Sequence, residues 1–294
     1  MCGLAGFVGG GDRGDLERMT RRLTHRGPDA EGFFIAEHSS VHLGHRRLSI
    51  IDLAGGAQPM ATADGNLIIV FNGEIYNHPE LRADLEARGC VFQTDHSDTE
   101  VLLHGYREYG EEFVRRLNGM WAFALWDAGR KRLFLSRDRF GKKPLYWFHR
   151  QGTFAFASEL TAVLEHPAAP RSLSVRALQK FFAYALIPAP LTPVADVWKL
   201  PAGHNLILES GEPPRLSRYW RYEIEPDESL AQRPEDELAG ELRDRLDRAV
   251  KRRLMADVPL GVFLSGGIDS TAIAALAARH VGAGRLRTFS IGFN

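Results

Sequence analysis

Short apolar segments alternate with turn residues along the first two hundred positions of the chain. Runs of apolar and β-branched residues bounded by Gly, Asp or Asn predict strands at residues 2–8, 41–50, 67–71, 120–126, 132–136, 144–148 and 154–157. Apolar residues at helical spacing predict helices at residues 15–23, 79–88 and 99–109. Many strands with a few helices predict an α+β domain of layered sheets with helices outside them.

The pattern changes after a proline-rich stretch at residues 187–234, which predicts an ordered connector followed by a polar linker. Residues 235–255 then carry apolar side chains four positions apart, the spacing of an amphipathic helix. A strand at 261–264, a glycine turn, a helix at 271–280 and a strand at 288–293 complete a β-α-β unit. Such units build parallel sheets, so a second domain of the α/β type is expected.

We therefore expect a first domain at residues 2–210, a linker at 211–234 and a second domain at 235–294. The second domain is shorter than a parallel sheet covered on both faces normally requires. We expect it to be an incomplete α/β domain, the beginning of a longer one.

Composition changes this picture only by exclusion. The 294 residues are 44% hydrophobic and 25% charged, and 37 basic residues balance 37 acidic ones. No excess charge indicates nucleic acid or a membrane surface as a partner. Two cysteines, Cys2 and Cys90, do not form a disulfide framework, which favours a reduced, cytoplasmic setting. The chain shows neither a signal-peptide pattern nor an apolar run of membrane-spanning length.

The position of Cys2 is the first candidate for chemistry. Removal of Met1 is favoured before a small residue, and it would leave Cys2 with a free α-amine beside its own thiol. An α-amine titrates at about 7.7–8.0 and a thiol at about 8.5, so the two can exchange a proton near neutral pH. One residue then supplies both nucleophile and base. The structural alternative is a small cysteine packed in an edge strand.

Three further segments carry polar groups suited to a substrate with opposite charges. Arg47, in a predicted strand, could hold a carboxylate through two hydrogen bonds. The Asn72 amide and the Gly73 N–H could together stabilise an oxyanion. Asp98 precedes a predicted helix. Taken singly, each has an ordinary interpretation: a surface arginine, an Asn-Gly hairpin turn, and a helix N-cap.

Together these segments resemble the class II glutamine amidotransferases, whose nucleophile is an N-terminal cysteine. The resemblance rests on Cys2 followed in order by RGPD, HRRLSI, NGEIYN and SDTE, and covers residues 2–209. It implies an N-terminal-nucleophile fold, an α/β/β/α sandwich of antiparallel sheets. It also implies that Cys2 attacks the glutamine amide while Asn72 and Gly73 stabilise the oxyanion. The glutamine-binding residues it implies are Arg47, Leu48, Ile50, Asn72, Gly73, Glu74 and Asp98.

The second domain carries SGGIDS, residues 265–270, between a predicted strand and a predicted helix. Glycines allow close approach of the backbone to an anion, and the N–H groups at a helix start point towards it. The alternative is an ordinary βα turn capped by Asp269 or Ser270. The motif resembles the pyrophosphate loop of ATP pyrophosphatases. That resemblance implies ATP-binding residues Leu264, Ser265, Gly266, Gly267, Asp269, Ser270 and Ile291, with Mg²⁺ bound to ATP near Asp269.

The two domains in this order, with RDRFGKKPLYW at residues 137–147, resemble the glutamine-hydrolysing asparagine synthetase family. The 137–147 segment itself is expected to be a turn between strands with no catalytic role. The resemblance implies a ligase that delivers ammonia from glutamine to an adenylated carboxylate, aspartate above all, with ATP and Mg²⁺ and no permanent cofactor. A homodimer is left open. Three alternative functions are also left open: the same chemistry on another acceptor carboxylate or sugar, glutaminase activity alone, and a non-catalytic module.

Overall fold

The computed structural model describes residues 1–282 and 284–292. The chain forms two compact units, Met1–Tyr222 and Glu223–Asn294. The first unit extends past residue 210 because β12 (Arg215–Arg218) pairs with β11 (His204–Glu209) in its sheet. The stretch expected as a linker, 211–234, therefore contains the last strand of the first unit.

The first unit contains two six-stranded sheets whose strand pairs are antiparallel. Sheet A has the order β10-β8-β9-β1-β3-β2 and sheet B the order β12-β11-β7-β6-β5-β4. The strands of sheet A are β1 (Gly3–Val8), β2 (Ala30–Ala36), β3 (Val41–Arg47), β8 (Tyr146–Arg150), β9 (Thr153–Ala157) and β10 (Trp198–Lys199). The other strands of sheet B are β4 (Met60–Ala61), β5 (Leu67–Ile75), β6 (Gly119–Asp127) and β7 (Arg132–Arg137).

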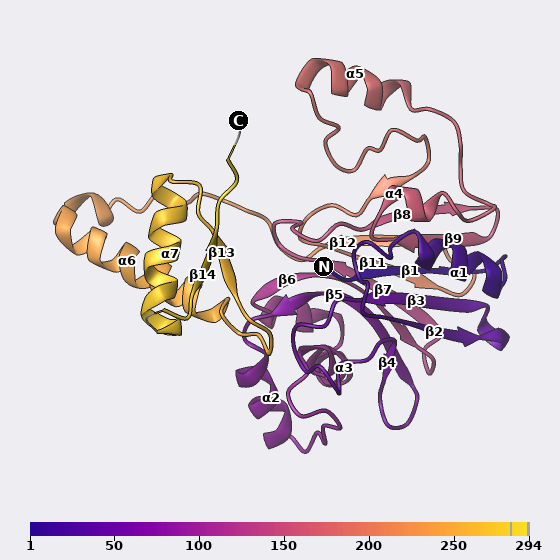
Figure 1. Cartoon of the computed structure of the whole chain (residues 1–294). Coiled ribbons are helices and arrows are strands. Elements are labelled where there is room, and N and C mark those ends of the chain that lie inside the picture. The colour runs from indigo at the N-terminus through magenta and orange to yellow at the C-terminus, as the bar shows by residue number, and fades with distance from the viewer. Residues whose placement is uncertain (283, 293–294) are drawn as a thin grey trace. The chain divides into compact units, whose positions relative to one another are not determined.

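Three apolar layers hold these sheets and their helices together. Leu4 and Leu43 of sheet A pack against Val70 and Leu135 of sheet B between the sheets. The outer face of sheet A is covered by α1 (Arg13–Arg21) and α4 (Leu160–Val163). The outer face of sheet B is covered by α2 (His78–Ala87) and α3 (Asp98–Tyr109). The first unit is therefore an α/β/β/α sandwich, as expected (Figure 1).

Several elements differ from those expected. Strand β5 continues through Asn72 and Gly73 to Ile75, so the Asn-Gly pair lies inside a strand and does not form a hairpin turn. Strand β3 ends at Arg47, three residues earlier than expected. Strands β2, β4, β10, β11 and β12 and helix α5 (Val175–Tyr184) were not predicted. Short 3-10 turns occupy Glu37–Ser39, Gly110–Arg116 and Leu230–Gln232.

The second unit contains α6 (Glu235–Arg252), β13 (Gly261–Phe263), α7 (Ile268–Val281) and β14 (Arg287–Phe289). Strands β13 and β14 pair in parallel, and with α7 between them they form the expected β-α-β unit. Its small core gathers Val250, Leu276 and Ala277. The strand expected at 288–293 ends at Phe289, and Phe293 lies outside the described residues.

Candidate active site

Cys2 lies immediately before β1. Strand alternation places it on the same side as Leu4, which faces the layer between the sheets. The thiol donates to the Leu48 carbonyl oxygen (3.6 Å) and accepts from the Leu48 N–H (3.4 Å). Arg26 Nε fixes the backbone by donating to the Cys2 carbonyl oxygen (2.9 Å). Burial raises the pKa of the Cys2 thiol, and the hydrogen bond with Leu48 opposes that rise.

Asn72 presents a buried donor with no partner. Its side chain is 1% exposed, and its Nδ2 makes no hydrogen bond among the described residues. An unpaired buried amide costs about 1–3 kcal/mol, so a native protein rarely keeps one without a use for it. Asn72 lines the same cavity as Cys2, where this donor could bind an oxygen that becomes negative.

The Gly73 N–H lies on a stretch of the β5 edge that none of the described strands covers. Strand β4 pairs only with Ile68 and Ile69. Beyond it, the Phe71 N–H donates to Gln58 Oε1 (2.6 Å) and the Ile75 N–H donates to Asp98 Oδ2 (3.0 Å). Alternate N–H groups of a strand point the same way, so that of Gly73 points between these two side chains. A Cβ at Gly73 would come within 2.2 Å of a backbone oxygen, so only glycine fits there.

The guanidinium of Arg47 is held in place by a loop folded around it. It donates to the carbonyl oxygens of Leu53 (3.0 Å), Ile51 (3.3 Å) and Asp52 (2.6 Å). The loop closes through the Gly56 N–H, which donates to the Asp52 carbonyl oxygen (2.8 Å). The guanidinium of Arg47 is thus held at the cavity wall by carbonyl oxygens.

Asp98 is the first residue of α3, and its buried carboxylate receives the Ile75 N–H. Ser97, and not Asp98, is the N-cap: its side chain accepts from the Thr99 N–H (3.3 Å). The N-cap interpretation of Asp98 is therefore wrong. Burial raises the pKa of Asp98 to about 6, against the hydrogen bond from Ile75 and those at the start of the helix.

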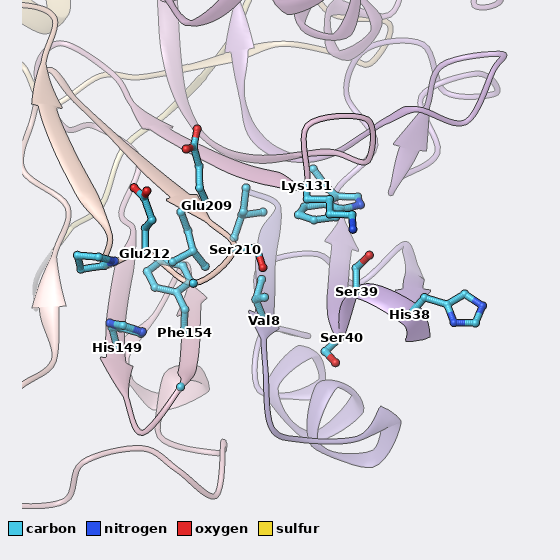
Figure 2. A pocket seen from close by; sticks show the side chains of 16 residues that line it. Val8, His38, Ser39, Ser40, Lys131, His149, Phe154, Glu209, Ser210 and Glu212 are labelled. Atoms are coloured by element: carbon cyan, nitrogen blue, oxygen red, sulfur yellow. The ribbon is translucent and has the colours of Figure 1, made fainter.

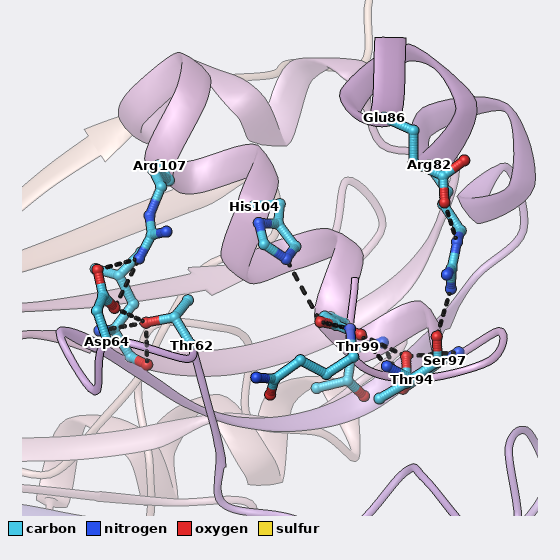
Figure 3. A network of polar contacts seen from close by, with 12 residues as sticks. Thr62, Asp64, Arg82, Glu86, Thr94, Ser97, Thr99, His104 and Arg107 are labelled. Atoms are coloured by element: carbon cyan, nitrogen blue, oxygen red, sulfur yellow. Dashed lines mark hydrogen bonds and ion pairs between the residues drawn. The ribbon is translucent and has the colours of Figure 1, made fainter. Parts of the chain in front are cut away.

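A polar network fixes the loop that leads into α3 (Figure 3). Glu100 accepts from the Gln93 N–H (2.7 Å), the Thr94 N–H (2.8 Å) and the Thr94 hydroxyl (2.5 Å). His104, one turn later, lies 3.4 Å from the same carboxylate. The burial of Glu100 opposes ionisation, but the Thr94 and Gln93 hydrogen bonds outweigh it and lower its pKa. The network sets where Asp98 begins the helix.

A cavity of about 160 Å³ brings the predicted glutamine-site residues together. Cys2, Arg47, Leu48, Ile50, Asn72, Gly73, Glu74 and Asp98 all line it. A cation and an anion therefore lie in one small pocket with a thiol and an unpaired amide. That arrangement fits a small zwitterion with a polar side chain better than it fits an apolar or larger ligand.

A larger hollow of about 660 Å³ lies elsewhere in the first unit (Figure 2). Val8 lines it, at the opposite end of β1 from Cys2, roughly 20 Å along the strand. His38, Lys131 and His149 at this hollow are exposed, and Glu209 is half-buried and ion-paired with Arg132. Nothing there matches the buried, hydrogen-bonded set around Cys2, so the smaller cavity is the candidate active site.

Sequence reasoning missed residues that hold this site. Within RGPD, Arg26 anchors Cys2 and Asp29 Oδ2 accepts the Ser49 N–H (2.8 Å), so the motif closes the loop beyond β3. Fully buried His45 Nε2 bonds the Phe71 carbonyl oxygen (2.9 Å) and ties β3 to β5. Burial lowers the pKa of His45 to about 4, so the ring is neutral and its Nε2 donates. The order of motifs was the only signal for these roles.

Lys143, expected to lie in a turn without a role, also lines the cavity. Its side chain is buried, and the segment that carries it joins β7 to β8. A lysine is rarely buried to this extent without a partner or a purpose. No local pattern in the sequence distinguished it from its exposed neighbour Lys142.

In the second unit, residues 264–267 form the loop between β13 and α7, and residues 268–270 of the motif already belong to the helix. Gly266 has φ +80°, and the Ser270 hydroxyl contacts the Ser265 hydroxyl (3.1 Å) and donates to the Gly267 carbonyl oxygen (3.1 Å). The helix begins at Ile268 with Gly267 as N-cap and no side-chain cap. Asp269 and Ser270 therefore lie in its first turn and do not cap it. Leu264 follows β13, while Ile291 lies beyond β14 and is exposed.

None of the helices in the described part of the chain has the length and apolarity to span a bilayer. Within the same residues, no group of three or more His, Cys, Asp or Glu side chains is placed to hold a metal ion.

Comparison with known proteins gives the family. The family model described as a glutamine amidotransferase domain matches residues 1–220. The chain belongs to the glutamine amidotransferase family. A second model, described as asparagine synthase, matches residues 241–294. The expected resemblance to the glutamine-hydrolysing asparagine synthetases is thereby confirmed.

Curated relatives agree with this membership, and a solved structure shares the fold. Asparagine synthetase [glutamine-hydrolyzing] 1 of Bacillus subtilis is 39% identical over 302 residues, covering 100% of this chain and 46% of the relative. A putative asparagine synthetase of Methanocaldococcus jannaschii is 35% identical, covering 100% of this chain and 60% of the relative. Glutamine PRPP amidotransferase of B. subtilis has a TM-score of 0.56 at 19% identity, covering 98% of this chain and 65% of that one, which supports the fold alone. The chain spans about half the length of its B. subtilis synthetase relative.

Proposed function

We propose that the first unit hydrolyses the side-chain amide of glutamine at Cys2. The observation that carries the proposal is the unpaired, buried Asn72 amide in one cavity with the Cys2 thiol. The lining of the cavity also includes the fixed guanidinium of Arg47 and the buried carboxylate of Asp98, beside Glu74 and Lys143. In this proposal Arg47 binds the α-carboxylate of glutamine and Asp98 binds its α-amine. Leu48, Ile50 and Glu74 line the same cavity.

The proposed reaction balances within these groups. The α-amine of Cys2, free after loss of Met1, takes the thiol proton, and the sulfur attacks the amide carbon. Negative charge forms on the amide oxygen, which the Asn72 Nδ2 and Gly73 N–H groups stabilise. The C–N bond breaks and ammonia leaves with the proton from the α-ammonium. Water then attacks the thioester, its proton passes through the amine to sulfur, and glutamate leaves.

We propose that the ammonia serves an ATP-dependent amidation. Relatives that span the chain are named glutamine-hydrolysing asparagine synthetases, which favours aspartate as the acceptor. ATP would adenylate the acceptor carboxylate and release pyrophosphate. Ammonia would then displace AMP, since a carboxylate is a poor electrophile until its oxygen becomes a good leaving group. If the protein does not adenylate aspartate, the alternatives are another acceptor for the ammonia or hydrolysis of glutamine alone.

The loop at residues 264–270 is the proposed contact for ATP, with Ile291 beside it. The residues fit an anionic ligand: Gly266 and Gly267 carry no side chain that would block a phosphate, and Ser265 and Ser270 bring two hydroxyls together. Asp269 adds a single carboxylate, so Mg²⁺ would arrive bound to the ATP phosphates. Because the Cys2 thiol must stay unoxidised to react, a reducing, cytoplasmic setting is proposed.

Glutamate release from glutamine tests the central proposal. Purified protein lacking Met1, verified by intact mass, should release glutamate, and Cys2→Ala should abolish release. Cys90→Ala is the matched control, because Cys90 packs against the outer core of sheet B and does not line the cavity. Release that persists in Cys2→Ala would exclude Cys2 as the nucleophile.

Equilibrium binding of ATP with Mg²⁺ tests the second unit separately. Ser265→Ala combined with Ser270→Ala should weaken binding, while glutamate release stays unchanged. Equal ATP affinity in the variant and the wild type would exclude this loop as the phosphate contact.

A further inference from the structure

Lys143 is a buried cation in the cavity that contains Cys2. Its side chain is 6% exposed, and it lines the cavity with Met1, Cys2, Glu74 and Met120. It comes from the segment joining β7 to β8, remote in sequence from the residues assigned to glutamine. The hydrolysis described above makes no use of it.

The turn that carries Lys143 is held rigidly by its two first residues. The Asp138 carboxylate accepts the N–H groups of Trp121 (3.2 Å), Phe140 (3.1 Å), Lys142 (3.0 Å) and Lys143 (3.0 Å). Arg137 donates to the carbonyl oxygens of Gly141 (2.7 Å), Lys143 (2.7 Å) and Leu200 (2.5 Å). Gly141 has φ +64°, a conformation that favours glycine. So many contacts fix the backbone at Lys143, and its side chain enters the cavity from a preset position.

The charges around this end of the cavity come from several elements. Groups whose charge acts on the N-terminal amine or on Lys143 are Cys2, Arg26, Asp29, Glu74 and Asp138. The charges of Arg47 and Asp98, which also line the cavity, act on the Cys2 thiol. Burial is the largest cause that lowers the pKa of Lys143, and the Arg26 charge adds to it. The charges of Glu74, Cys2 and Asp138 oppose that shift and favour the ammonium form.

The N-terminal amine lies within the influence of this ammonium. Burial is the largest cause that lowers the pKa of the Met1 amine, the Cys2 charge opposes it, and Lys143 and Arg26 lower it further. After Met1 is lost, the amine belongs to Cys2 and lies one residue nearer to the thiol. A fixed positive charge nearby disfavours a second positive charge on that amine.

We propose that Lys143 is a positioning residue of the glutaminase pocket: its buried ammonium keeps the α-amine of Cys2 unprotonated and ready to accept the thiol proton. The inference rests on the proposed function of Cys2. It gives the 137–147 segment a role in the reaction. It also explains why a rigid, glycine-dependent turn delivers a lysine to a cavity that already contains Arg47.

The dependence of kcat/KM on pH tests this role. In Lys143→Met the amine holds its proton more tightly, so the acidic limb of glutamate release should move up by about one pH unit. The rate below that limb should fall about tenfold, and the plateau at high pH should stay close to that of the wild type. Lys143→Arg, which keeps the charge, should keep the limb in place. Lys142→Met is the matched control, since Lys142 is the exposed neighbour in the same turn.

Alkylation of residue 2 provides a readout that does not need turnover. The rate at which iodoacetamide modifies the peptide containing Cys2, followed by mass spectrometry against pH, should show the same upward shift in Lys143→Met. The inference would be overturned if Lys143→Met kept the wild-type pH of the acidic limb of kcat/KM and the wild-type pH midpoint of Cys2 alkylation. An equal loss of activity at every pH would overturn it as well. Activity that persists in Cys2→Ala would instead overturn the proposed function, so the two failures are distinguishable.

Discussion

At the scale of single residues, the candidate site is built from polar groups that cost the fold stability. Asn72 keeps a buried donor without a partner, and Asp98 buries a carboxylate. Replacing either one by an apolar or neutral group of similar size would make the fold more stable. In the proposed reaction glutamine would contact both groups, with its amide oxygen at Asn72 and its ammonium at Asp98.

Asn72→Ala should separate catalysis from binding. Loss of one donor to the oxyanion should lower kcat for glutamate release by about 10²–10³-fold and leave KM within a few-fold. Asn205→Ala is the matched control, because Asn205 is equally buried, in β11, and does not line the cavity. The assignment of Asn72 fails if both variants show the same kcat.

Asp98→Asn should raise stability while it impairs binding. The pKa of Asp98 in the folded protein, about 6, lies above the ordinary value of about 3.9. Ionisation of Asp98 therefore costs stability, and the cost appears as pH rises through 6. At pH 7 the variant should be more stable by roughly 1–3 kcal/mol in denaturant unfolding, and the difference should vanish near pH 4.

The same variant should raise KM for glutamine, because a neutral amide binds an ammonium less well than a carboxylate does. For the wild type, KM should rise as pH falls below 6. A KM in Asp98→Asn equal to that of the wild type at pH 7 would contradict the binding role of Asp98.

At the scale of elements, the sequence predicted those with a strong apolar period and missed those without one. Strands β1, β6, β7 and β9 were predicted nearly to the residue because their apolar runs end at turn residues. Strand β2 was missed because it begins Ala-Glu-Gly and only part of its surface is buried. Asn72-Gly73 resembled a turn, yet β6 pairs along the whole of β5 and keeps it extended. Tertiary pairing overrode the local preference there.

The candidate residues themselves were predicted from motif order, while their supports were not. Cys2, Arg47, Asn72, Gly73 and Asp98 line one cavity as expected. The supports come from segments distant in the sequence, and no local pattern encodes such contacts. Gln58 and His45 contact Phe71, and Lys143 lines the cavity together with Cys2, more than 100 positions away.

Glu100→Gln should loosen the start of α3. The Glu100 carboxylate accepts three hydrogen bonds from Gln93 and Thr94, and a glutamine would turn its NH₂ group towards some of these donors. This loss should lower the free energy of unfolding by about 2–3 kcal/mol. The pKa of Glu100 is lowered in the folded protein, so its contribution is present at neutral pH and is lost as pH falls through that lowered value. KM for glutamine should also rise, because Asp98 loses its fixed position.

Glu108→Gln is the control for that substitution. Glu108 lies on the same helix but is exposed, and its ion pair with Arg88 is long at 3.4 Å. Its change in unfolding free energy should stay within about 0.5 kcal/mol. Equal effects of the two substitutions would show that the buried network does not hold the helix start.

At the scale of the whole molecule, the candidate site lies inside one of the two units. Every residue that lines the Cys2 cavity lies between Met1 and Lys143, inside the first unit. The first unit also contains three extended apolar layers of its own, whereas the second has a core of only a few buried side chains.

A chain of residues 1–222 should therefore fold and keep glutaminase activity. We expect cooperative thermal unfolding and a kcat/KM for glutamate release within about threefold of the whole chain, because no cavity residue is removed. A chain ending at residue 210 is the comparison. It loses β12, exposes the edge of β11 and should unfold at lower temperature. Loss of activity in the 1–222 chain with its fold intact would place part of the site in the second unit.

Covalent capture at residue 2 tests the central claim most directly. A glutamine analogue with a chloromethyl ketone in place of the side-chain amide should alkylate the thiol that attacks glutamine. Its site can be read by peptide mass spectrometry on protein lacking Met1. We predict one adduct per chain, on Cys2, blocked by excess glutamine and lost in Arg47→Met. Labelling of Cys90 instead, or labelling of Cys2 that glutamine does not block, would contradict a glutaminase site in this cavity.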